Sequence, residues 1–164
     1  MTLDQVNALP PGRFVEAFGD VAEHSSWVAE SAAHQRPFAS RQAMIDAFVA
    51  ALKNSSAESQ RTVIRAHPDL ATRARLTVDS TREQLRAGLD ALSPLELTRF
   101  NSLNTRYRQR FGFPFIFAVR GATKHQILDS FEHRMDCTPD AEFATALDQV
   151  CRIIGFRIED RVMQ

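Results

Sequence analysis

The sequence has little of what marks nucleic-acid-binding, membrane or disulfide-bonded proteins. Lys plus Arg and Asp plus Glu each number 20, so no net charge would attract a polyanion or an anionic membrane surface. Cys137 and Cys151 fit no zinc-binding spacing and are too few for a disulfide framework. No apolar run approaches the length that spans a membrane. We therefore expect free thiols in a reducing compartment, and binding to neither nucleic acid nor membrane.

Targeting signals are also missing. The opening MTLDQVNALP lacks the basic-then-apolar pattern of a secretory signal, and the final RVMQ differs from the peroxisomal SKL signal. These features predict a cytoplasmic protein. A chain of 164 residues suits one domain with a sizeable core, so residues 1–164 are expected to form a single domain.

Helical periodicity dominates the rest of the chain. Ser80-Thr81-Arg82-Glu83 and Ser93-Pro94-Leu95-Glu96 both have the form of a capping box. Pro68 biases His67 away from helical geometry, so one helix should end there. Gly112 is a predicted helix stop. Helices are expected to begin near Pro10, Ser25, Ser40, Ser80, Ser93, Thr123 and Thr138, with a further one running through Val63 and Ile64.

One apolar stretch, FGFPFIFAVRG from Phe111 to Gly121, lacks helical character. Pro114 lies in its middle and apolar residues occupy both alternating faces, so an extended segment here would be buried on both sides. No second strand-like run could pair with it, and its backbone amides need partners among side chains, water or a ligand. The sequence thus predicts an all-α, single-domain helical bundle with one buried extended segment at about 112–120. That segment either holds a small polar molecule or only connects two helices.

His67 is the first candidate for chemistry. It lies at a predicted helix end, and an imidazole is the side chain best suited to proton exchange near neutral pH. A structural role for a single histidine is the alternative.

Glu83 has two interpretations as well. It can reach back to the Ser80 N–H as the last residue of a capping box, or it can mark a polar, anion-tolerant corner at a helix start. The helix from Ser80 is predicted to carry Leu85, Leu89 and Leu92 on one face. Gly88 leaves a gap on the face of Gln84 that can admit a neighbouring helix or a ligand.

Arg157 follows the predicted apolar stripe of the last helix and therefore needs an anionic partner. That partner is a protein carboxylate or a bound anion. Arg120, at the end of the apolar stretch, is a similar candidate for pairing with a protein carboxylate or a bound anion.

Five runs of the sequence form a specific combination: HSSWVAESA (24–32), RPF (36–38), AHPDLA (66–71), LTVDSTREQLRAGLD (76–90) and FNSLNTRYRQRFGFPFIFAVRG (100–121). Together with the closing helix they resemble the OHCU decarboxylase family. Members of that family act on 2-oxo-4-hydroxy-4-carboxy-5-ureidoimidazoline (OHCU), the last intermediate between urate and (S)-allantoin. The resemblance extends from about Leu9 to Val162 and depends on HPDLA, SxxEQ and FGFPF occurring together.

The resemblance implies an all-helical fold, a homodimer, and catalysis without a metal or an organic cofactor. It places the family's catalytic histidine on His67 and its glutamate on Glu83. It also implies the substrate-binding positions Pro68, Ser80, Thr81, Arg82, Gln84, Phe115, Ile116, Phe117, Ala118, Val119 and Arg157.

Two points of the resemblance stay open. Arg161 is a rival to Arg157 because the last helix is loosely patterned, and either His67 or Glu83 could take the first proton. The implied activity is decarboxylation of OHCU to (S)-allantoin. A non-catalytic helical binding module and a lyase acting on a related ureido acid are the alternatives, and the joint presence of His67, Glu83 and Arg157 argues against the first.

Overall fold

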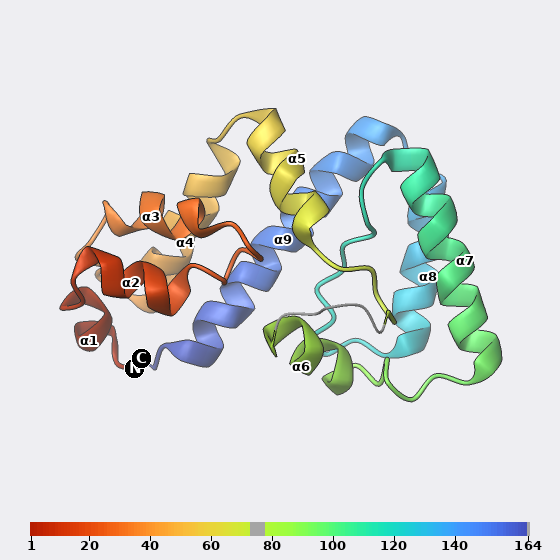
Figure 1. The fold of residues 1–164 in the computed structure, drawn as a ribbon, viewed down its shortest axis with the longest axis horizontal. Helices are drawn as coiled ribbons and strands as arrows, with labels where there is room; N and C mark the ends of the chain where they lie inside the picture. Colours follow the sequence, from red (N-terminus) through yellow and green to blue (C-terminus); the bar gives the residue numbers. More distant parts are fainter. Residues whose placement is uncertain (73–77, 164) are drawn as a thin grey trace. The chain divides into compact units, whose positions relative to one another are not determined.

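The structure, a computed structural model, describes residues 1–72 and 78–163, and Figure 1 shows helices joined by loops. In chain order the helices are α1 (Leu3–Asn7), α2 (Pro11–Phe18), α3 (Ser26–Ala33), α4 (Arg41–Lys53), α5 (Ala57–Ala66), α6 (Val78–Arg86), α7 (Pro94–Phe111), α8 (Lys124–Met135) and α9 (Pro139–Arg161). Within the described ranges there is no strand, only an isolated bridge between Thr2 and Met163. The predicted all-α class is confirmed.

The chain forms two compact units. The first comprises residues 1–66 and 150–164, and the second comprises residues 67–149. Helix α9 is continuous and contributes its first half to the second unit and its last half to the first unit.

The first unit has an aromatic centre on α2. The ring of Phe14 lies 5.1 Å from that of Phe18, 6.1 Å from that of Phe38 and 6.0 Å from that of Phe48. These side chains are buried, and Phe14 and Phe18 lie one helical turn apart on α2. Aromatic residues at helical spacing on α2 therefore form the core of this unit.

The second unit is centred on Tyr107 of α7. Its fully buried ring makes edge contacts with Phe115 at 5.4 Å and with Phe131 of α8 at 5.7 Å. Phe115 stacks on Phe131 at 3.8 Å, and α7 and α8 lie side by side in Figure 1. The aromatic cluster fixes the segment after α7 against both helices.

Most of the helix boundaries predicted from capping are confirmed. The Ser40 hydroxyl accepts a hydrogen bond from the Ala43 N–H, and Ser93 and Thr123 each form a complete capping box. Gly112 ends α7 with a left-handed φ of 76°, a conformation that glycine adopts without steric cost. Helix α5 ends at Ala66, directly before His67. The short helix α1 was not predicted, although Thr2-x-x-Gln5 is a capping-box signal.

The predicted start at Ser80 is wrong. Helix α6 begins at Val78, so Ser80 is the third helical residue and not its cap. The helix ends at Arg86, and Gly88 follows it with a left-handed φ of 73°. Leu85 is 52% exposed and Leu89 lies beyond the helix, so the expected stripe of leucines does not form. Since Gly88 lies outside the helix, the predicted helical spacing between Gln84 and Gly88 does not form.

Candidate active site

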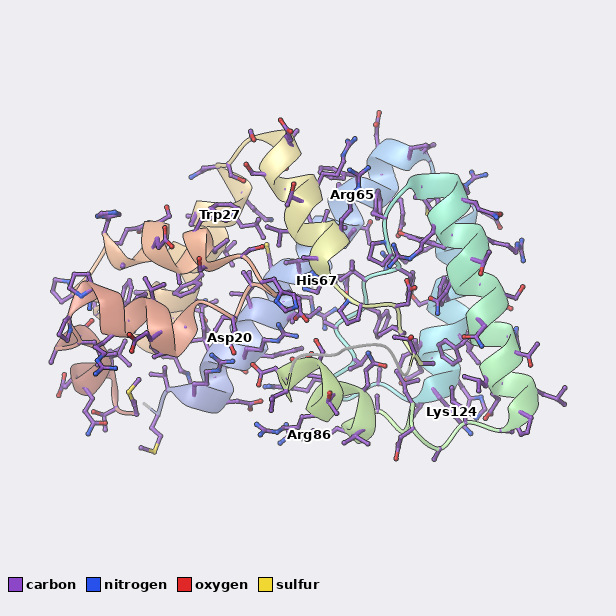
Figure 2. All side chains as sticks on the ribbon, viewed as in Figure 1. Asp20, Trp27, Arg65, His67, Arg86 and Lys124 are labelled. Atoms are coloured by element: carbon purple, nitrogen blue, oxygen red, sulfur yellow. The ribbon has the colours of Figure 1, made fainter. Side chains whose placement is uncertain are left out.

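His67 is the first residue after α5, and Figure 2 labels it at that helix end. It is only 5% exposed, and the Nε2 atom of its ring is itself buried. Pro68, which follows, is half-buried. An imidazole held in the protein interior at a chain turn is a suitable proton-transfer group once a substrate excludes water from it.

The segment that follows His67 is fixed at three successive residues. Asp69 accepts hydrogen bonds from Arg108 of α7 at 2.8 and 3.0 Å. The Leu70 carbonyl accepts one from the Asn104 side chain at 2.9 Å. The Ala71 N–H donates to Oε1 of Gln84 at 3.0 Å, in a left-handed conformation (φ 58°) that alanine rarely adopts. These contacts link the HPDLA motif to both α7 and α6.

One face of α6 points toward the protein. Ser80 and Gln84 are buried and Glu83 is half-buried, at positions that share one side of a helix. Thr81 and Arg82 are exposed on the opposite side. Because Gln84 bonds directly to the HPDLA backbone, Glu83 lies on the helix that this motif packs against. The five predicted positions on α6 therefore fall into two sets. The inner set is Ser80, Glu83 and Gln84, and the outer set is Thr81 and Arg82.

The central segment, defined as Phe113–Val119, is buried except for the half-buried Phe117. The rings of Phe113 and Phe115 both contact Tyr107, and the Phe115 and Phe117 rings stack at 6.1 Å. Alternate residues thus share one side, which is the period of an extended chain. The predicted buried extended segment is confirmed.

Two backbone groups of the central segment are held by side chains. The Ile116 carbonyl accepts a hydrogen bond from Nη1 of Arg134 at 2.6 Å, and the Ala118 N–H donates to Oε1 of Gln149 at 2.9 Å. By contrast, the N–H and C=O of Phe117 make no hydrogen bond within the described part of the chain. Backbone groups with this freedom are the ones that a polar ligand can use.

A buried polar cluster of Arg134, Glu142 and Tyr107 supports the central segment. Arg134 donates to Oε1 of Glu142 at 2.7 Å, and the Tyr107 hydroxyl donates to the same oxygen. Burial, followed by this bond to Glu142, raises the pKa of Tyr107, so the phenol stays protonated. The cluster was not predicted from the sequence, because nothing in the spacing of the three residues shows that they meet.

Arg157 belongs to the first unit and is 2% exposed. Its Nη1 atom donates to Glu23 at 2.7 Å and to the Val21 carbonyl at 3.2 Å. A protein carboxylate therefore meets the need for an anion that its burial predicts. Arg161, one turn later, is half-buried and donates to Asp20 and to the Ala17 carbonyl. Although burial raises the pKa of Asp20, the hydrogen bond from Arg161 holds it below its usual value.

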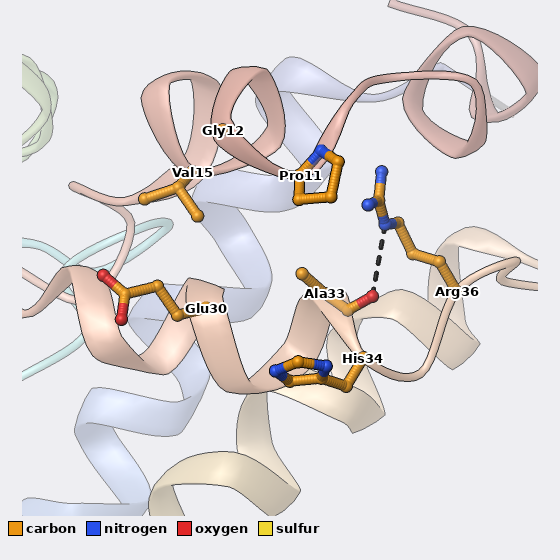
Figure 3. Close-up of a pocket in the computed structure, with 7 residues that line it drawn as sticks. All are labelled: Pro11, Gly12, Val15, Glu30, Ala33, His34 and Arg36. Atoms are coloured by element: carbon orange, nitrogen blue, oxygen red, sulfur yellow. Dashed lines mark hydrogen bonds between the residues drawn. The ribbon is translucent and has the colours of Figure 1, made fainter.

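A separate cavity of ≈ 290 Å³ lies between α2 and α3 in the first unit (Figure 3). Its lining comprises Pro11, Gly12, Val15, Glu30, Ala33, His34 and Arg36. None of these is a predicted site residue, and Arg36 is engaged by the Ala33 carbonyl at 3.2 Å. Among the described residues there is also no group of three or more His, Cys, Asp or Glu placed to hold a metal ion. No described helix is long and apolar enough to cross a membrane.

Comparison with known proteins gives concordant matches. The sequence model described as OHCU decarboxylase matches residues 7–159. The 2-oxo-4-hydroxy-4-carboxy-5-ureidoimidazoline decarboxylase of Haloferax volcanii is 44% identical, with 98% of this chain and 96% of that protein covered. The uric acid degradation bifunctional protein PucL of Bacillus subtilis is 37% identical over 99% of this chain, which matches 33% of that protein. A crystal structure of (S)-allantoin synthase superimposes with a TM-score of 0.83 at 32% identity, covering 99% of this chain and 54% of the other.

These matches define an all-helical enzyme of the carboxy-lyase class, in which a carbon–carbon bond to a carboxylate is broken. The chain belongs to the OHCU decarboxylase family. The family match runs through both compact units.

Proposed function

We propose that this chain converts OHCU to (S)-allantoin and CO2 in urate catabolism, with His67 and Glu83 as its proton-transfer groups. The observation that supports this assignment best is the hydrogen bond from Ala71 to Gln84. It ties the HPDLA motif, which begins at His67, to the SxxEQ motif, which contains Glu83. Two motifs that are apart in the sequence are thereby joined in one local structure.

The reaction requires little of the protein beyond substrate binding and proton transfer. In OHCU the departing carboxylate sits on a carbon that also bears a hydroxyl, next to a ring carbon conjugated with nitrogen. When CO2 leaves, the electron pair of the broken bond spreads into the ring as an enol, so we propose that neither a metal nor an organic cofactor is required. Protonation of the ring carbon that carries the ureido group, from one face only, then gives the S product. His67 and Glu83 can polarise the hydroxyl and supply this proton.

Substrate binding is assigned to the inner face of α6 and to the central segment. Ser80 and Gln84 present hydroxyl and amide groups at buried positions. The N–H and C=O of Phe117, which make no hydrogen bond among the described residues, can pair with the amides of the ureido group or the ring. Pro68 and the side chains of Phe115, Ile116, Ala118 and Val119 would exclude water, and Thr81 and Arg82 would lie at the exposed margin of the site.

The direct test is addition of freshly prepared OHCU to the purified protein, with the optical activity of the product followed over time. Rapid formation of (S)-allantoin, faster than the spontaneous racemic reaction, is the expected result. Binding without turnover would instead identify a non-catalytic module. Turnover of a related ureido acid but not of OHCU would identify a different lyase.

The binding role of Arg157 is proposed separately. A planar guanidinium makes paired N–H bonds that lysine cannot make, so Arg157→Lys is expected to weaken binding of (S)-allantoin by roughly 1.5–3 kcal/mol, the value of a hydrogen bond to a charged group. Isothermal titration calorimetry would measure this loss of affinity for (S)-allantoin. Arg161→Lys is the matched control, since its ion pair with Asp20 is partly exposed and worth little.

If Arg157→Lys lowers only the melting temperature, its bond to Glu23 is the whole of its role. A larger loss of affinity at Arg161 would move the binding arginine one helical turn along α9.

We also propose that residues 1–164 act as one domain, and that the enzyme is a cytoplasmic homodimer binding neither nucleic acid nor membrane. The family match across both units supports the first point. Large apolar side chains exposed on the second unit, Val78, Leu85 and Leu95, are suited to burial against a second copy. Light scattering coupled to size-exclusion chromatography would give the mass, and a monomer at micromolar concentration would contradict the dimer.

A further inference from the structure

The two edges of the central segment differ in the hydrogen bonds that their backbone groups make. In an extended chain the N–H and C=O of one residue point to one edge, and those of the next residue point to the other. The Ile116 carbonyl and the Ala118 N–H therefore share an edge, and both are bonded to side chains, of Arg134 and Gln149. Phe117 lies between them and directs its N–H and C=O to the opposite edge.

Arg134 is rigidly held at its edge. It is 6% exposed, its guanidinium carbon lies 4.3 Å from the centre of the Phe115 ring, and it pairs with Glu142. Glu142 is fully buried in the first turn of α9, where the helix dipole favours a negative charge. The Tyr107 hydroxyl donates to Glu142 as well. The cation that binds Ile116 thus has one fixed position relative to α7, α8 and α9.

A fixed extended edge resembles half of a β-ladder. The N–H donor and C=O acceptor of a single residue can bond to the C=O and N–H of a facing amide, as in an antiparallel pair. A ureido group carries the same donor and acceptor combination. The position of Phe117 would then determine where such a group binds.

We propose that Arg134 and Gln149 are positioning residues that hold the central segment by one edge, so that the N–H and C=O of Phe117 bind the ureido or ring amide of the substrate. This inference rests on the proposed function, because OHCU is taken as the ligand. Neither residue touches the reacting atoms. They act through the backbone to which they bond.

The sharpest test compares Gln149→Glu with Gln149→Met. Glutamate keeps an oxygen acceptor for the Ala118 N–H, whereas methionine has nearly the same length and lacks it. Gln149→Met is expected to raise KM for OHCU and Kd for (S)-allantoin about five- to tenfold, the effect of one hydrogen bond, with kcat changed by less than about twofold. Gln149→Glu should stay within about twofold of the wild type in all three quantities. Equal KM values for the two variants would overturn the proposal.

Arg134→Lys is expected to act in the same direction and to raise KM at least about tenfold, because lysine loses the fork that joins Glu142 to Ile116. Arg99→Lys is the control, since Arg99 pairs with Glu132 on the exposed side of α7 and α8 in the same unit. If the Arg134→Lys variant does not fold, the comparison of Gln149→Met with Gln149→Glu tests the proposal by itself.

Amide hydrogen exchange gives a readout that a purely structural role would not change. In the wild type, (S)-allantoin should slow exchange of the Phe117 N–H and leave that of the Ala118 N–H nearly unchanged, because Gln149 already bonds it. If (S)-allantoin instead protected the Ala118 N–H and not the Phe117 N–H, the ligand would bind the opposite edge of the central segment, and the proposal would be wrong. A wild-type enzyme that does not turn over OHCU refutes the proposed function, whereas full turnover with unaltered KM in Gln149→Met refutes only the positioning role.

Discussion

His67→Asn is expected to leave the protein folded and to lower kcat by ~10²–10⁴, the range for loss of a general acid–base group. Asparagine is smaller than histidine and polar, so it fits a buried position at the end of α5 without adding a charge. What it cannot do is exchange a proton near neutral pH. Steady-state kinetics with fresh OHCU would measure the loss, and circular dichroism would verify the helical content.

His133→Asn provides the matched control for this experiment. His133 is exposed on α8 in the same unit, and its replacement should leave kcat and KM unchanged. Near-normal turnover by a folded His67→Asn protein would show that the buried imidazole is structural.

Glu83→Gln is expected to reduce kcat by a similar factor, ~10²–10⁴. Glutamine keeps the size and hydrogen-bonding capacity of glutamate and removes its ability to take up a proton. Because Ser80 lies inside α6, Glu83 is not part of a capping box, and the earlier alternative of a capping role no longer applies. Because glutamine retains this hydrogen-bonding capacity, the free energy of unfolding should change by less than about 1 kcal/mol, the scale of a helix cap.

Glu132→Gln tests whether removal of any carboxylate in this unit has the same effect. Glu132 pairs with Arg99 at an exposed position, so its loss should cost under about 1 kcal/mol of stability and no activity. If Glu83→Gln retains turnover while its melting temperature falls, the carboxylate has only a structural function.

The helix starts show which parts of the fold the sequence can predict. At Ser93 and Thr123 the cap and its partner three residues later are both local, and both capping boxes form as predicted. The same pattern at Ser80 does not open a helix. There α6 begins earlier, at Val78, and the serine is buried inside it. Local hydrogen bonding predicts a cap only when the rest of the protein leaves the preceding residues outside the helix.

Long-range pairing limits what could be predicted of the candidate site. The extended character of the central segment follows from Pro114 and the alternating phenylalanines, because both are local features. Its supports do not, since Arg134 and Gln149 reach it from other helices. Likewise, burial of Arg157 was predicted from its place beside an apolar stripe, but its partner Glu23 is 134 residues away in the sequence. The roles of these residues in catalysis stay predictions.

The division of the chain into its two units has a consequence for the order of folding during synthesis. Residues 67–149 are contiguous, so every contact inside the second unit can form before translation ends. The first unit is interrupted by that insertion, and its closing contacts, such as Glu23 with Arg157 and Met1 with Met163, join residues more than 100 positions apart. Contacts with so large a sequence separation carry the greatest loop-closure entropy and form late. The N-terminal helices therefore emerge from the ribosome with part of their core uncovered, and stay so until the last half of α9 arrives.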